Sequence, residues 1–397
     1  MDKRKYLILL FFMAMIHSAK AQLSALQVAD SVSTDLYNAG NWKQLIAYGN
    51  QSIATGVDFT GLRLRVAYAN FITGDYKHAL KQYNKVLAKD PYNITARYYA
   101  YYCNKYLADD LHATYNLSYL DKETLHKDGI NTPIFTDINA ETGIKQNDDI
   151  NRNNAFYSRV GIGNRIGWRL QLEQSAAYFD QGIFKLYDVT DRRRTTTTTL
   201  HLADQQKEYY AKLSFAVNQN MAIIGSYHYL NTKFDNITYN SNLGLIGLKY
   251  TGTYIDAQAD VNFGRLDAEP LEQYNAKLTY YPFGNFNLYT ISRASVKELN
   301  SDRNFIFDQT IGFKLIKNTW LESSVALGNL DDYLDADGLY VYNGIDNTTF
   351  KCGEAAYYQL NNNVQLQLNY FYERKSDAYQ SLKYDQNSVT VGIVWKF

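Results

Sequence analysis

Ser226 and His228 are the residues whose types and spacing come closest to nucleophilic chemistry. A lipid hydrolase or acylase built on a barrel needs a serine hydroxyl within hydrogen-bond reach of a histidine. Residues i and i+2 of a strand share a face, but they lie about 7 Å apart along it. We therefore predict no catalytic residues, and we expect both side chains to line a polar lumen. His201 is expected in a long loop.

Four aspartates, at 331, 332, 335 and 337, form the densest acidic cluster in the chain. Carboxylates are ligands that Ca²⁺ prefers, but their order here lacks the EF-hand register. We expect a solvated loop at 330–348. No Cys/His metal spacing, Gly-rich phosphate loop or His-Glu-x-x-His helix occurs in the sequence, so we expect neither a metal nor a cofactor.

The most biased segment is Arg192-Arg193-Arg194 followed by five threonines. Guanidinium groups pair with phosphate in bidentate fashion, so these arginines are candidate contacts for lipopolysaccharide. The alternative is a solvated tip between two extended arms, Ile183–Val189 and Thr196–Leu202, and the sequence leaves both open. Threonine favours strands, which predicts that the arms form a hairpin.

The last nine residues have the alternation of a strand with one apolar face. That face carries Val389, Val391, Ile393, Trp395 and Phe397. The other face carries Ser388, Thr390, Gly392 and Lys396, with Val394 as the exception. The stretch resembles the C-terminal strand of bacterial outer-membrane barrels, which the barrel-assembly machinery reads. Trp395 and Phe397 are therefore expected to act as an assembly signal, with outer-membrane lipid covering the apolar face.

Similar alternating strands recur every 10–12 residues from about residue 134. Thirteen are clear, and residues 134–145 supply a weaker first strand, so we predict 14 strands with 12 as the alternative. Short turns alternate with longer loops, as in outer-membrane barrels. A soluble sandwich or propeller does not explain this alternation. The longer loops are expected at 179–205, 231–240, 266–272, 299–303, 330–348 and 375–385.

The N-terminal third contains two segments whose sequence patterns differ from that of the strands. Residues 1–21 read as a secretory signal with cleavage between Ala21 and Gln22. Residues 22–128 have helical spacing that recurs with a period of about 34 residues. The period is clearest in the unit from Gly74 to Pro91, which resembles a tetratricopeptide repeat. A third, weaker unit is expected as a cap. Such repeats imply a periplasmic protein partner; the alternative is a folded spacer.

The net charge bears on the possible partners, and the positions of the cysteines bear on disulfide bonding. Removing residues 1–21 takes away four cations and one acid, so the net charge becomes 0 − 4 + 1 = −3, which argues against nucleic acid. Cys103 and Cys352 fall in different domains and are expected to be unpaired.

The whole layout resembles the YaiO-type outer-membrane β-barrel family. Two stretches carry the likeness, Tyr281–Tyr289 and Asp337–Asn343. The predicted fold is an α+β two-domain chain, with a short tetratricopeptide-like solenoid (22–128) before a transmembrane antiparallel barrel (129–397). The resemblance implies the outer membrane of a Gram-negative bacterium. The expected function is non-enzymatic passage or secretion of an envelope-associated molecule such as a polysaccharide. The alternatives are a non-conducting anchor for a periplasmic complex and, last, a lipid hydrolase.

Overall fold

The computed structural model describes residues 25–149, 151–191, 194–235, 237–299, 302–378 and 382–397. The chain divides into two compact units after Leu125. The predicted signal segment, with Ala21 and Gln22, lies outside the described residues.

The first unit is helical, and its helices recur at a constant interval. After a helix over residues 25–38 come α2 (Trp42–Ala54), α3 (Thr60–Ile72), α4 (Tyr76–Leu87), α5 (Ile94–Tyr106), α6 (Asp110–Leu117) and α7 (Lys122–Lys127). Helices α2, α4 and α6 begin at equal intervals (76 − 42 = 110 − 76), and α3 and α5 are separated by the same interval (94 − 60). The spacing agrees with the predicted period.

The turn inside each helix pair shows why the third repeat is weak in the sequence. Gly40 and Gly74 have φ of 67° and 81°, which glycine adopts without steric cost. Ala108 occupies the same place with φ of 50°. Asp109 then caps α6 through the amide of His112, as Asp75 caps α4. The third unit is therefore a complete helix pair. Its turn was hard to recognise in the sequence because alanine stands where the other units have glycine.

Polar pairs repeat with the helices as well. Arg63 Nη1 donates to Gln82 Oε1 at 2.6 Å, and, one repeat later, Arg97 Nη1 donates to Asn116 Oδ1 at 2.9 Å. The core between them is apolar and includes Cys103, which is fully buried.

Burial raises the pKa of the Cys103 thiol. Both Cys103 and Cys352 are free. Among the described helices, none is long and apolar enough to span a membrane.

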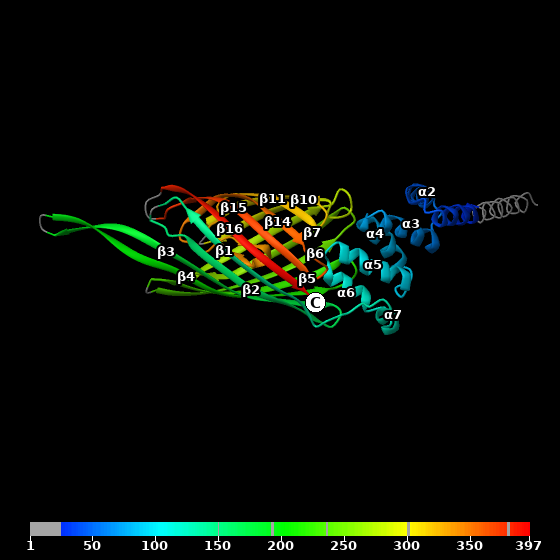
Figure 1. Ribbon diagram of the computed structural model, residues 1–397, viewed down its shortest axis with the longest axis horizontal. Coiled ribbons are helices and arrows are strands. Elements are labelled where there is room, and N and C mark those ends of the chain that lie inside the picture. The colour runs from blue at the N-terminus through cyan, green and yellow to red at the C-terminus, as the bar shows by residue number, and fades with distance from the viewer. Residues whose placement is uncertain (1–24, 150, 192–193, 236, 300–301, 379–381) are drawn as a thin grey trace, which may run out of the picture. The chain divides into compact units, whose positions relative to one another are not determined.

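The second unit is a closed antiparallel barrel of 14 strands, which confirms the predicted fold class and count (Figure 1). Its strands are β1 (Phe135–Asn147), β2 (Ala155–Ile166), β3 (Leu170–Asp191), β4 (Arg194–Ala216), β5 (Met221–Phe234), β6 (Ile237–Thr251), β7 (Ile255–Leu266), β8 (Glu269–Tyr280), β9 (Leu288–Leu299), β10 (Asp302–Ile316), β11 (Thr319–Leu327), β14 (Asn347–Gln359), β15 (Val364–Ser376) and β16 (Lys383–Lys396). The first strand pairs with the last, with Ile138 opposite Trp395. Closure leaves no unpaired sheet edge.

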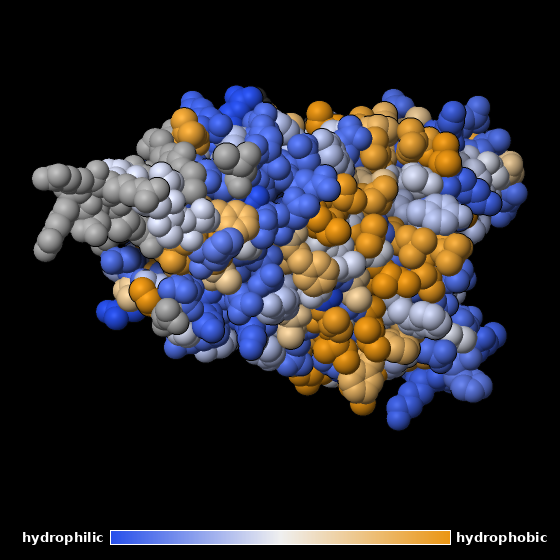
Figure 2. Space-filling model, turned by 60° about the vertical axis from the view of Figure 1, so that its left-hand side comes forward, coloured by the Kyte–Doolittle hydropathy of each residue, from blue (hydrophilic) through white to orange (hydrophobic). Residues whose placement is uncertain are grey.

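Side chains alternate between the two faces of this barrel. The apolar residues of β16 point outward, and Val391, Trp395 and Phe397 are about half exposed (50%, 53% and 55%). Phe156, Val160, Ile246, Leu248 and Leu368 are similarly exposed on other strands. Figure 2 shows hydrophobic side chains gathered in a band across the barrel face in view. Ser388 and Thr390 face inward.

Most of the predicted long loops are strand instead. Strand β5 ends at Phe234 and β6 begins at Ile237, and β7 ends at Leu266 and β8 begins at Glu269, so the expected loops at 231–240 and 266–272 are wrong. Polar residues continue the hydrogen-bonded ladder past the apolar alternation, and periodicity alone does not detect them. The loop expected at 179–205 is the hairpin β3–β4, which extends past its neighbours (Figure 1). Its two predicted arms pair with each other, Ile183 opposite Leu202.

Candidate functional site

The connection between β11 and β14, residues 328–346, folds back into the barrel; we call it the lumen loop. It contains β12 (Leu334–Asp335), a 3-10 turn η1 (Ala336–Gly338) and β13 (Tyr340–Val341). Inward-facing side chains bind its backbone carbonyls: Arg159 binds Leu339, Tyr210 binds Asp337, Gln206 binds Asn343, and Gln273 binds Leu334. The stretch 337–343, which carried the family likeness, therefore lies inside the lumen.

The acidic cluster is held by barrel cations. Asp337 lies 3.0 Å from Lys212 Nζ and 3.6 Å from Lys277 Nζ, and Asp335 pairs with Arg293. Only 15% of the Asp337 side chain is exposed, so the expectation of a solvated loop is wrong. Its cations lie on strands far away in the sequence, and the local pattern does not reveal them. Among the described residues, no group of three or more His, Cys, Asp or Glu side chains is placed to hold a metal.

Ser226 and His228 both face the lumen, and both bind the lumen loop. Ser226 Oγ donates to the Asp337 carbonyl at 2.8 Å, and His228 Nδ1 lies 2.8 Å from the Gly338 carbonyl. A carbonyl only accepts, so Nδ1 carries the proton. His228 Nε2 then lies 3.3 Å from Glu208. The serine hydroxyl is therefore bonded to the loop and not to the histidine, and this arrangement gives no activated nucleophile.

One side of the lumen is tightly packed against the loop. We call strands β5–β8 the packed wall. Its leucines, one from each strand, form an apolar cluster with Leu334 of the loop: Leu230, Leu243, Leu266 and Leu271. Gln273 holds the loop at the same residue. Its side-chain amide donates to the Leu334 carbonyl at 2.7 Å and accepts from the Leu334 amide at 3.0 Å.

A buried ionic cluster holds the end of the lumen loop. Arg152 binds Asp346 in bidentate fashion at 2.7 and 2.8 Å and reaches Asp377 at 3.0 Å. Tyr384 adds a hydrogen bond to Asp346 at 2.8 Å. The four groups come from the connection after β1, the lumen loop, the connection after β15, and β16. They tie three connections and one strand together at one end of the barrel.

A cavity of about 470 Å³ remains on the opposite side of the loop. None of its lining residues comes from the packed wall. We call β1 and β14–β16 the open wall, since they line the cavity together with the loop and parts of β2–β4 and β9–β11. The volume lies within the range of about 300–1,000 Å³ that is usual for small-molecule sites.

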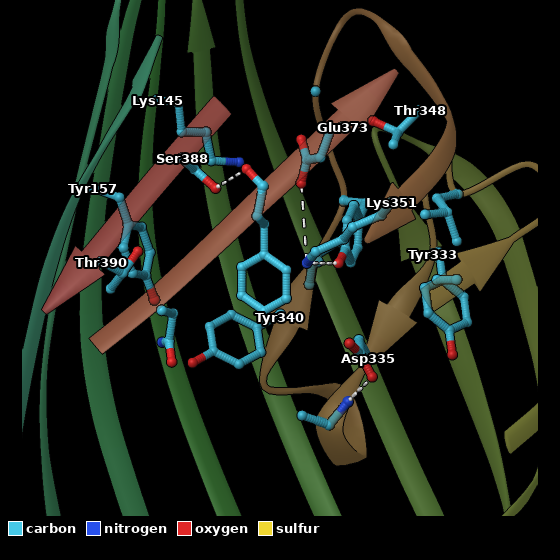
Figure 3. Close-up of a pocket in the computed structure, with 18 of the residues that line it drawn as sticks. Lys145, Tyr157, Tyr333, Asp335, Tyr340, Thr348, Lys351, Glu373, Ser388 and Thr390 are labelled. Atoms are coloured by element: carbon cyan, nitrogen blue, oxygen red, sulfur yellow. Dashed lines mark hydrogen bonds and ion pairs between the residues drawn. The ribbon is translucent and has the colours of Figure 1, made fainter. Parts of the chain in front are cut away.

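Charged and aromatic groups line this cavity together (Figure 3). Glu141 accepts from Tyr157 at 2.9 Å and from Tyr340 at 3.1 Å. Lys351 donates to Tyr342 at 2.5 Å and lies 4.0 Å from Glu373 (Figure 3). The lumen therefore offers hydrogen-bonding groups beside aromatic faces.

One loop carboxyl titrates near neutrality. Burial raises the pKa of Asp332 from 3.8 to about 7, with a further increase from Asp331 and an opposing effect of Lys297. Lys297 itself donates to the carbonyl of Asp331. The lumen loop is therefore sensitive to pH where it meets β9.

Sequence reasoning missed the inward charges that hold the loop, above all Arg159, Lys212 and Lys277. One signal was present: the expected loop contains Leu330, Tyr333, Leu334, Leu339 and Tyr340–Tyr342, which is too apolar for a solvated segment.

The remaining predicted site residues lie elsewhere. Trp395 and Phe397 are on the outer face. Arg192 and Arg193 are outside the described residues, and Arg194 lies opposite Asp191 at the end of the hairpin. His201 is in strand β4, not in a loop, and packs edge-on against Phe184 at 4.8 Å. The stretch 281–289 forms the β8–β9 connection and the start of β9.

No protein-family model matches the sequence, and no curated protein matches it. Solved barrel structures are similar at 7–8% identity. The Pseudomonas putida toluene transporter TodX covers 66% of this chain and 89% of its own, with a TM-score of 0.45. A bacterial polysaccharide outer membrane secretin covers 67% and 100% with a TM-score of 0.41, and a Pseudomonas aeruginosa FadL homologue covers 66% and 90% with 0.42.

Proposed function

We propose that this protein is an outer-membrane β-barrel through which a small hydrophilic molecule passes, without catalysis, along the open wall. The observation that carries the proposal is the cavity of about 470 Å³ between the lumen loop and the open wall. A barrel that served only as an anchor has no need of such a cavity. Its charged and tyrosine lining suits a polar solute.

The membrane location is supported by the fold and its surface. A closed antiparallel barrel satisfies every backbone group internally, which a bilayer demands, and the outward band of apolar side chains suits lipid. The signal-like N-terminus and the family resemblance point the same way. Trp395 and Phe397 at the barrel's end are the groups we propose as the assembly signal.

The helical unit is proposed to stand in the periplasm as a tetratricopeptide-like adaptor that docks a protein partner. The constant interval between its helices supports the repeat assignment. If the molecule that passes through the barrel is a polysaccharide, the proposed function becomes polysaccharide secretion. A polymer needs a continuous path, so this version requires the lumen loop to move away from the open wall.

A second function is favoured by the lumen loop itself. Because the loop fills one side of the lumen and is bound to strands from β2 to β9, the barrel also suits a non-conducting anchor for a periplasmic complex.

Recordings of the purified full-length protein in planar lipid bilayers separate the two. For passage, we expect small, discrete conductance steps. A variant in which residues 331–345 are replaced by a short Gly/Ser linker should give larger steps, because the obstruction is removed. An assembled, heat-modifiable barrel that stays silent in its natural form would overturn passage in favour of the anchor.

A further inference from the structure

The cavity beside the open wall has more acids than bases. Its lining includes eight carboxylates and five cations, a formal balance of 5 − 8 = −3. The carboxylates are Glu141, Glu208, Asp308, Glu322, Asp331, Asp335, Asp346 and Glu373. The cations are Lys145, Arg159, Arg293, Lys351 and Lys375. An anionic ligand is therefore disfavoured in this cavity.

Three of the lining carboxylates stand apart from the ion pairs. Among the described residues, no ion pair within 4.0 Å involves the carboxylate of Asp308, Glu322 or Asp331, whereas the other five each have at least one. Glu322 accepts hydrogen bonds from Tyr289 and Tyr357, at 2.5 and 3.1 Å. These groups offer the cavity spare hydrogen-bond acceptors.

The cavity also contains spare donors. The Arg159 side chain is only 4% exposed, and its Nε and Nη1 are buried without a hydrogen-bond partner. Glu208 lies 3.5 Å from Nη2, and Glu141 lies 3.7 Å from Nε, which is too far for a hydrogen bond to Nε. Its third nitrogen, Nη2, already donates to the Leu339 carbonyl. A buried guanidinium with two unused donors requires an acceptor from a ligand or from water.

Aromatic rings lie beside two of the cations that line the cavity. The Arg159 guanidinium stands 4.5 Å from the centre of the Tyr340 ring, and the Lys351 ammonium 4.2 Å from that of Phe371. Tyr340 projects from the lumen loop into the cavity (Figure 3). The lining therefore combines spare acceptors, spare donors and apolar ring surface.

We propose that this cavity is a binding site for a neutral saccharide of one or two rings. A sugar hydroxyl both donates and accepts, so the hydroxyls of one ligand suit both the carboxylates and the guanidinium of this lining. The C–H faces of the ring suit the aromatic side chains. An organic cation leaves the Arg159 donors unmatched and places charge beside a guanidinium. The inference rests on the proposed function, because it names the class of molecule that enters the lumen.

Saturation-transfer NMR on the full-length protein in detergent micelles tests the inference. The neutral probes are glucose, galactose, N-acetylglucosamine and their disaccharides; glucuronic acid is the anionic probe and spermidine the cationic one. We expect at least one neutral sugar to bind with a dissociation constant in the millimolar range. Binding of only glucuronic acid or spermidine would overturn the ligand class, and no binding by any neutral probe would overturn the site.

Matched variants locate the binding. Asp308→Asn and Arg159→Lys should each weaken the sugar about tenfold, the loss expected for a hydrogen bond to a charged group. Asp302→Asn and Arg165→Lys, on the same strands but outside the cavity lining, should leave it unchanged. Sugar binding that survives both lining variants would place it elsewhere and overturn the proposal. Bilayer conductance is measured separately, so a barrel that conducts without binding sugar refutes this inference alone.

Discussion

The lumen loop makes different contacts with the two sides of the lumen. Against the packed wall, the lumen loop buries Leu334 among four leucines and is hydrogen-bonded by Ser226, His228 and Gln273. Against the open wall it makes hydrogen bonds, such as those of Tyr340 with Glu141 and Tyr342 with Lys351, and leaves a cavity. Apolar packing is dense and intolerant of change. Between its ends, the loop is therefore packed against one wall, whereas a cavity separates it from the other wall.

The largest test of this difference is Asp337→Ala, at the tip of the loop. It leaves the Lys212 and Lys277 ammonium groups without their shared carboxylate, which should cost the seated loop about 3–5 kcal/mol. We expect amide hydrogen exchange in residues 331–345 to accelerate accordingly. Asp335→Ala, where the lost carboxylate is 29% exposed, should have a smaller effect. Equal effects of the two variants would contradict a loop fixed by its tip.

A second test compares one residue from each wall. Leu243→Ala removes a 1% exposed side chain from the apolar cluster and should lower the free energy of unfolding by about 2–5 kcal/mol. Gln367→Ala, on the open wall, borders the cavity and should change it by no more than about 0.5 kcal/mol. Urea unfolding in micelles, followed by tryptophan fluorescence, measures both. Similar losses would mean that the walls are equally packed.

The smallest effect concerns pH. The pKa of Asp332 is raised to about 7 in the seated loop from an ordinary 3.8. The seated loop therefore holds a proton that a released loop gives up, so this stabilisation is complete below about pH 4 and is lost as pH rises through about 7. In bilayers, the larger-conductance state should be more populated at about pH 8 than at about pH 5. Asp332→Asn should flatten that difference; an unchanged pH response would assign it to another group.

The barrel could be predicted because its signal is local. A strand in a membrane barrel must alternate between lipid and lumen along its own length, so residues such as Val391 and Trp395 reveal their face without knowledge of their neighbours. The count of 14 strands, including the weak first strand, followed from that rule. The helical period was equally local, and it faded only where Ala108 replaces the glycine of the repeated turn.

The lumen loop could not be predicted, because its partners are distant. Asp337 looked like part of a solvated acidic loop, yet its charge is matched by Lys212 and Lys277 on two separate strands. The same holds for Ser226 and His228, which alternation placed on the lumen face but which tertiary contacts assigned to the loop's carbonyls.

The sequence alone determined the number of strands, their inward and outward faces and the period of the helix pairs, because these patterns recur along the chain; it did not determine where the strands end. Only the tertiary structure decided what occupies the lumen. Barrel closure brings inward side chains from opposite strands around one returning loop, and no local pattern encodes which buried charge meets which.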